Sequence, residues 1–157
     1  MCRINKYEVV CEKVESYNTD VIDRKIANSK DVAVLLTDVI GIHKSPVERF
    51  VVIMVNCKMQ LIGYQEIGIG GTDTCPVDIK AVFRAAIVSG MCSGIVVAHN
   101  HPSGDPTPSN EDASLTKNLI KAGELLGVKV LDHLIIGDKA YTSMKAEGYF
   151  DACLNTL

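Results

Sequence analysis

The chain has 157 residues, of which 47% are apolar, so it can bury the core of a single domain. Its formal charge of −3 argues against a protein that coats nucleic acid or anionic lipid, because such binding needs clustered lysines and arginines. We expect a cytoplasmic protein without a membrane partner, because charges interrupt the N-terminal region and no apolar run approaches about 18 residues.

The first half of the chain predicts two helices, a hairpin and a third helix. A short helix is expected at residues 19–28, and Ser29 is suited to cap a second one. Apolar residues then recur at helical spacing: Val32, Leu35, Leu36, Val39 and Ile40. Two apolar runs at 50–56 and 59–69 predict a hairpin. Pro76 suits the first position of a further helix that ends at Gly90, and its expected buried face is Ile79, Val82, Phe83, Ala86 and Ile87.

The second half predicts a buried strand at 93–99 and a loop rich in proline and glycine. A helix from about residue 110 to Gly127 follows, with an expected buried stripe of Leu115, Leu119, Ala122 and Leu126. Strands at 128–137 and 140–144, joined by a tight turn, complete the order, and residues 150–157 are expected to fray. Alternating strands and helices predict a three-layer α/β/α sandwich with a mixed sheet and helices on both faces.

Six cysteines lie far apart in the sequence, with no CxxC pair: Cys2, Cys11, Cys57, Cys75, Cys92 and Cys153. We interpret them as reduced thiols of a cytosolic protein rather than as metal ligands. Cys75 is the least certain of the six, because a thiol at a helix N-terminus can have a lowered pKa.

A candidate metal site follows the strand at 93–99. His99 and His101 stand two residues apart where the strand ends, so their side chains can converge on one point. Asp112 lies on the first turn of the next helix, and the loop can fold back to bring its carboxylate to the same point. Two imidazoles and one carboxylate leave one open position on a tetrahedral zinc, which is typical of catalytic zinc. We expect one zinc ion per chain.

Taken singly, these residues have ordinary interpretations. A His-x-His pair occurs by chance in many chains, Ser109 is suited to be a helix N-cap, and Asp112 is suited to a capping box or to the helix dipole. The spacing of the whole string HNHPSGDPTPSNED favours a metal site.

That string resembles the JAMM motif of the JAB/MPN metalloproteases, and AHNHPSGDP with AGELLGVKVLDHLIIGD resembles the RadC family in particular. The resemblance covers roughly residues 17–147. It implies the α/β sandwich of the MPN domain, which is related to the cytidine deaminases. It also implies hydrolysis of peptide or isopeptide bonds in a protein or peptide substrate by a zinc-activated water.

The resemblance implies a general base, and an enzyme of this kind would give roles to further residues of this chain. Glu48, just before the predicted strand at 50–56, matches the general base, with Glu66 as the second choice. Ser109 would donate to the developing oxyanion. Asp132 and His133 would either orient a metal ligand or satisfy polar groups of their own strand.

Two departures limit what the resemblance implies. Asn100 stands between the histidines where many members carry Ser or Thr, as it does in RadC-like proteins. We expect no helix-hairpin-helix module of full-length RadC proteins in this sequence, which weakens a role on DNA. The alternatives are a DNA-repair accessory or nuclease-like metal enzyme and a catalytically silent metal-binding module. A zinc deaminase is excluded, because its His-x-Glu and Pro-Cys-x-x-Cys motifs are missing from the sequence.

Overall fold

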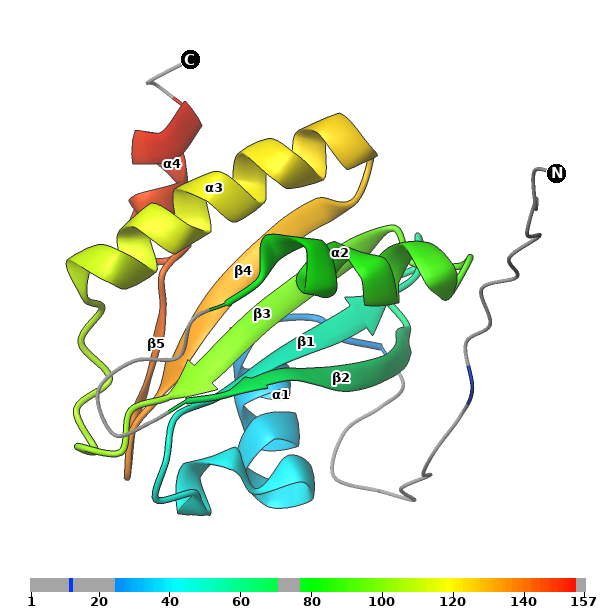
Figure 1. The fold of residues 1–157 in the computed structure, drawn as a ribbon. Coiled ribbons are helices and arrows are strands. Elements are labelled where there is room, and N and C mark those ends of the chain that lie inside the picture. The colour runs from blue at the N-terminus through cyan, green and yellow to red at the C-terminus, as the bar shows by residue number, and fades with distance from the viewer. Residues whose placement is uncertain (1–11, 13–24, 71–76, 155–157) are drawn as a thin grey trace, which may run out of the picture.

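A five-stranded mixed sheet with the strand order β2-β1-β3-β4-β5 lies at the centre of the computed structural model (Figure 1). The structure describes residue 12, residues 25–70 and residues 77–154. The elements are α1 (Ser29–Val34), η1 (Leu35–Ile40, a π-helical segment), η2 (Ile42–Lys44, a 3-10 turn), β1 (Arg49–Val55), β2 (Leu61–Ile69), α2 (Ile79–Val88), β3 (Gly94–Asn100), α3 (Asn110–Leu126), β4 (Lys129–Ile136), β5 (Tyr141–Ser143) and α4 (Tyr149–Leu154).

Antiparallel and parallel pairing are combined in this sheet. Strands β1 and β2 form the predicted hairpin, and β1 also pairs antiparallel with β3. Strands β3 and β4 run parallel and are connected through α3, whereas β4 and β5 are antiparallel. The C-terminal ends of the parallel strands β3 and β4 therefore lie at the same edge of the sheet, where the metal-site sequence begins.

Strand β1 is buried on both faces of the sheet, which explains its unbroken apolar sequence. Phe50, Val52 and Met54 pack into the cluster beneath α2 and α3. The alternate residues, Val51, Ile53 and Val55, pack into the cluster beneath α1 and η1. Helices thus cover both faces, as Figure 1 shows, and the predicted three-layer α/β/α architecture is confirmed.

Helix boundaries differ in detail from the sequence prediction. Asn28, not Ser29, is the N-cap of α1, and its side chain accepts a hydrogen bond from the Asp31 backbone N–H. Helix α2 begins at Ile79 with Asp78 as its N-cap. Pro76, proposed as its first residue, lies outside the described part of the chain. These differences arise because several polar residues near a helix start can compete for the cap.

The predicted buried stripes extend too far at the C-terminal ends of two helices. Ile87 is 53% exposed and Leu126 is 48% exposed, although Phe83 and Leu119, earlier in the same two stripes, are buried. Helix α3 ends where Gly127 adopts a φ of 69°, as its sequence predicts. Helical spacing predicts which residues share a face, but it does not show how far along the helix that face is covered.

The structure contradicts two expectations about chain segments, the first of them in the part of its range that the structure describes. Residues 25–28 of the expected first helix are not helical, and Lys25 forms an isolated antiparallel bridge with Gln60. Residues 19–24 are not described. Residues 150–154, expected to fray, belong to α4, because Phe150 is buried against α3 and β4 in a small third cluster. None of the helices in the described part of the chain has the length and apolar character that crossing a membrane requires.

Candidate metal centre

The two predicted histidine ligands lie at the end of the central strand β3. His99 is flanked by Phe50 of β1 and Ile135 of β4, so its backbone is held on both sides. The backbone N–H of His101 continues the ladder by donating to the Ile136 carbonyl at 2.9 Å. The imidazoles lie on the same side of the chain, with their Nε2 atoms 3.0 Å apart.

The loop after His101 is held against the turn between β4 and β5. The Asp138 N–H donates to the Gly104 carbonyl at 3.1 Å, and a Cβ on Gly137 would overlap that carbonyl oxygen. The loop in turn orients His101, because Nδ1 lies 2.7 Å from the Asp105 carbonyl oxygen. A carbonyl only accepts, so Nδ1 carries a proton and Nε2 is directed to the site.

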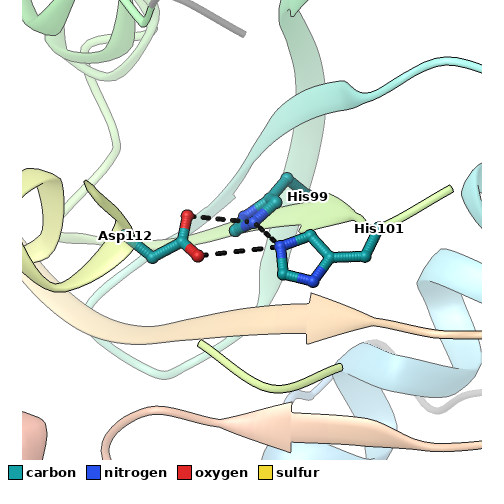
Figure 2. A group of neighbouring side chains, drawn as sticks. All are labelled: His99, His101 and Asp112. Atoms are coloured by element: carbon teal, nitrogen blue, oxygen red, sulfur yellow. Dashed lines mark hydrogen bonds and ion pairs between the residues drawn. The ribbon is translucent and has the colours of Figure 1, made fainter. Parts of the chain in front are cut away.

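Asp112 reaches the histidines from the first turn of α3. Its Oδ2 accepts from the Ser109 N–H at 2.8 Å and from the Ser109 hydroxyl at 2.6 Å, which completes a capping box. Its Oδ1 lies 3.1 Å from His99 Nε2, and Oδ2 lies 3.6 Å from His101 Nε2 (Figure 2). The helix-capping and ligand interpretations of Asp112 are therefore compatible in one conformation.

His99, His101 and Asp112 form a group that could hold a metal ion. Their ligand atoms all lie within 4.8 Å of one another, and within the described part of the chain this is the single group of three or more such residues. The thiols of Cys57 and Cys92 are free and outside the group. The remaining cysteines, including Cys75, belong to parts of the chain whose side chains are not described.

Electrostatics in this group favour a cation. Burial alone raises the pKa of Asp112, but hydrogen bonds with His101, His99 and Ser109 outweigh it and hold the pKa well below the usual range. The pKa of His101 is raised, chiefly by its interaction with the Asp112 carboxylate, although burial opposes this. Asp112 is therefore ionised at neutral pH and attracts a positive charge, either a proton on His101 or a metal ion.

The two candidate bases have different surroundings. Glu48, which precedes β1, has a side chain 17% exposed and places Oε1 3.8 Å from His99 Nε2. The Glu66 carboxylate on β2 accepts hydrogen bonds from Nε and Nη2 of the Arg49 guanidinium, at 2.9 and 2.7 Å. The hydrogen bonds from Arg49 lower the pKa of Glu66, which makes it a weaker base. The structure thus brings Glu48 to the metal group and gives Glu66 another partner.

Asn100, between the two histidines, attaches the segment around Glu48 to β3. Its buried side-chain oxygen accepts from the Arg49 N–H at 2.9 Å. Its amide nitrogen donates to the carbonyls of Ser45 and Val47 at 3.3 and 3.1 Å. In the sequence Asn100 stands out only as a departure from other metalloproteases, and its role in holding the Glu48 segment was not predicted. The available signal was a polar amide at the end of a strand that is apolar apart from His99.

His133 of β4 lies directly behind His99. The ring is fully buried, its Nε2 lies 2.9 Å from His99 Nδ1, and its Nδ1 lies 2.7 Å from the hydroxyl of Thr116 on α3. Burial lowers the pKa of His133 well below its ordinary value, so the ring is neutral. Thr116 was not singled out from the sequence, where it is one polar residue on a helix.

Asp132, the other residue proposed to support the ligands, turns toward β5. Its carboxylate accepts hydrogen bonds from the Ser143 hydroxyl at 2.6 Å, from the His133 N–H at 2.8 Å and from the Lys145 N–H at 3.1 Å. These bonds hold the chain after β5 against β4. Asp132 therefore acts on the backbone of His133 rather than on its ring.

A mixed sheet between two helical layers, with a His-x-His pair at the end of a central strand and an aspartate on the next helix, defines an α/β protein with a JAB-type candidate metal site. The family model of the RadC-like JAB domain matches residues 26–149. The chain therefore belongs to the RadC-like JAB domain family.

Curated relatives support the same assignment. The chain is 51% identical over 104 residues to a UPF0758 protein of Caldanaerobacter subterraneus, which covers 66% of this chain and 44% of the relative. It is 46% identical over 123 residues to one of Carboxydothermus hydrogenoformans (78% and 53%) and 39% identical over 126 residues to one of Methanosarcina mazei (80% and 54%). The chain spans about half the length of the curated relatives it matches.

Proposed function

We propose that the protein is a zinc-dependent hydrolase that cleaves peptide or isopeptide bonds. The observation that carries the proposal is the combination at one point of two imidazole nitrogens, the Asp112 carboxylate and a further carboxylate, that of Glu48, 3.8 Å from His99 Nε2. Three ligands and a separate base are the parts that a hydrolytic metal site requires.

The donor set fits zinc. Imidazole nitrogen and carboxylate oxygen are common zinc ligands, and three protein ligands leave the open position that distinguishes catalytic from structural sites. The proposal is one zinc per chain, held by His99, His101 and Asp112. When bound, zinc lowers the pKa of a coordinated water to about 7 and polarises a carbonyl oxygen.

In this proposal Glu48 moves the protons of the reaction. Its carboxylate takes a proton from the attacking water, the oxygen adds to the carbonyl carbon, and the same proton passes to the leaving amine as the C–N bond breaks. Asn100 supports this role, because its hydrogen bonds hold the backbone on both sides of Glu48.

Ser109 is the proposed donor to the oxyanion. Its hydroxyl donates to Asp112 Oδ2 at 2.6 Å, so the hydrogen is already directed into the site. Donation to a substrate oxygen requires the hydroxyl to rotate away from Asp112. One such donor is worth on the order of 3 kcal/mol of transition-state stabilisation.

The test is Glu48→Gln, assayed with zinc-loaded protein on a mixture of protein-derived peptides whose cleavage is followed by mass spectrometry. Gln keeps the size of the side chain but cannot take up a proton at neutral pH. Zinc content and Tm should stay near wild type, while turnover falls by about a hundredfold to ten-thousandfold.

Glu66→Gln is the matched control and should leave turnover intact, because Glu66 is paired with Arg49. Unchanged turnover in Glu48→Gln would remove Glu48 as the base, and loss of zinc would make it a ligand instead. Wild-type protein that binds zinc but cleaves no peptide would favour the catalytically silent module. Cleavage of DNA alone would favour the nuclease alternative.

A further inference from the structure

A continuous line of buried polar groups runs from α3 through β4 to the candidate metal centre. It begins at the backbone carbonyl of Asp112, 2.7 Å from the Thr116 hydroxyl, and passes through His133 to His99. We propose that Thr116 and His133 are positioning residues that fix the tautomer of His99 so that Nε2 presents its lone pair to the metal. This inference rests on the proposed metal site.

The single proton of the Thr116 hydroxyl determines which groups donate and which accept along this line of hydrogen bonds. The Asp112 carbonyl oxygen can only accept, and the Met144 sulfur, 3.4 Å from the hydroxyl, is also an acceptor. With its proton directed to either of them, the hydroxyl presents a lone pair to His133 Nδ1, which lies 2.7 Å away. His133 Nδ1 must then carry a proton.

The protonation of His133 determines which nitrogen of His99 carries a proton at the metal centre. A neutral His133 with its proton on Nδ1 has a bare Nε2, which accepts from His99 Nδ1 at 2.9 Å. His99 Nε2 is then free of a proton and faces Asp112 Oδ1 at 3.1 Å. In the opposite direction, His99 would carry its proton on Nε2, where it blocks metal binding.

Burial keeps water from exchanging protons with these hydrogen-bonded side chains. Thr116 and His133 are fully buried and His99 is 1% exposed. The ring of Phe50 stacks on His99 at 6.1 Å between centroids and meets His133 edge-on at 5.8 Å. Because Thr116 lies one helical turn after Asp112, the chain also ties the orientation of His99 to the helix that carries the aspartate ligand.

The test compares Thr116→Val with Thr116→Ser. Valine has nearly the same shape as threonine but no hydroxyl, so the His133 Nδ1 proton loses its acceptor and His99 its fixed tautomer. Zinc affinity, measured by competition with a chromogenic chelator, should fall by about 10- to 100-fold, as is typical for residues that orient metal ligands. Thr116→Ser keeps the hydroxyl and should bind zinc like the wild type.

Ring protonation gives a second readout, which needs no variant. Long-range 1H–15N correlation spectra of the wild-type protein should show the proton on Nδ1 of both His99 and His133, in zinc-free and zinc-loaded protein alike. A proton on His99 Nε2 in the zinc-free protein would overturn the proposal, and so would wild-type zinc affinity in Thr116→Val. Wild-type protein that binds no zinc would instead defeat the proposed hydrolase, whereas the spectra would still report the tautomers.

Discussion

Asp112 and His101 form a pair in which each side chain changes the protonation of the other. The Asp112 carboxylate is held by the Ser109 N–H and hydroxyl, and its pKa is lowered despite burial. The pKa of His101 is raised above its ordinary value of 6.5, with Asp112 as the largest cause. A proton on His101 and a metal ion therefore compete for the same negative charge.

This competition predicts opposite pH dependences for zinc-free stability and for zinc binding. The raised pKa of His101 stabilises the zinc-free protein fully below pH 6.5, and this stabilisation is lost as pH rises through the folded-state pKa. Apparent zinc affinity should rise with pH over the same range, by about tenfold per pH unit for one displaced proton.

The measurements are an NMR titration of the His101 ring in zinc-free protein and zinc titrations at several pH values. Glu66→Gln is a suitable control, since it changes a carboxylate of the same sheet that is paired with Arg49. A His101 pKa at or below 6.5 would contradict the prediction.

Among the secondary-structure elements, β3 is joined to the segment before β1 by the side chain of Asn100. Three backbone groups depend on this amide: the Arg49 N–H and the carbonyls of Ser45 and Val47. The amide is 1% exposed, so water cannot readily replace it. Asn100 thus holds the Glu48 segment in register with the metal-binding strand.

We expect Asn100→Ala to destabilise the fold by about 1–3 kcal/mol, because it leaves buried backbone groups without partners. Urea unfolding followed by circular dichroism measures the change. Asn118→Ala, on the exposed side of α3, is the control. It should cause no loss of stability, because the asparagine is exposed and alanine is a better helix former. If Asn100→Ala loses no more free energy of unfolding than Asn118→Ala, the three hydrogen bonds do not stabilise the fold.

The sequence predicted most of these elements because their determinants are local or periodic. The strand β1 followed from an unbroken apolar run, and both ends of α3 followed from Ser109 and Gly127. Ile87 and Leu126 were placed wrongly because helical spacing does not show how far along a helix its apolar face is covered by other elements. The identity of an element was therefore easier to predict than its limits.

In the candidate site, too, some residues could be identified from the sequence and others could not. His99, His101 and Asp112 could be selected because their spacing is a motif, and the structure brings them together. The choice between Glu48 and Glu66 depends on Arg49, which is far from Glu66 in sequence and reaches it from the neighbouring strand β1. Thr116 and His133 become neighbours only when α3 packs on β4, so no spacing indicates their contact.

In the molecule as a whole, the candidate metal centre joins the sheet to one helical layer. Its histidines come from the end of β3 and its aspartate from the start of α3, with an irregular loop between them. A metal ion bound by all three would cross-link these elements in the folded state. The unfolded chain offers no preformed site, so binding energy would add to folding stability.

We therefore expect zinc to raise the Tm of the metal-stripped protein. With free zinc at about 100 times Kd, the gain is about 2.7 kcal/mol. At about 2–4 °C per kcal/mol for a chain of this size, this corresponds to a rise of about 5–11 °C. Differential scanning calorimetry with and without zinc measures it. His101→Ala should abolish the rise with little damage to the core, because this ring is the most exposed of the three ligands, whereas Glu48→Gln should retain it. An equal rise in His101→Ala would mean that zinc binds elsewhere, and no rise in the wild type would contradict the metal centre itself.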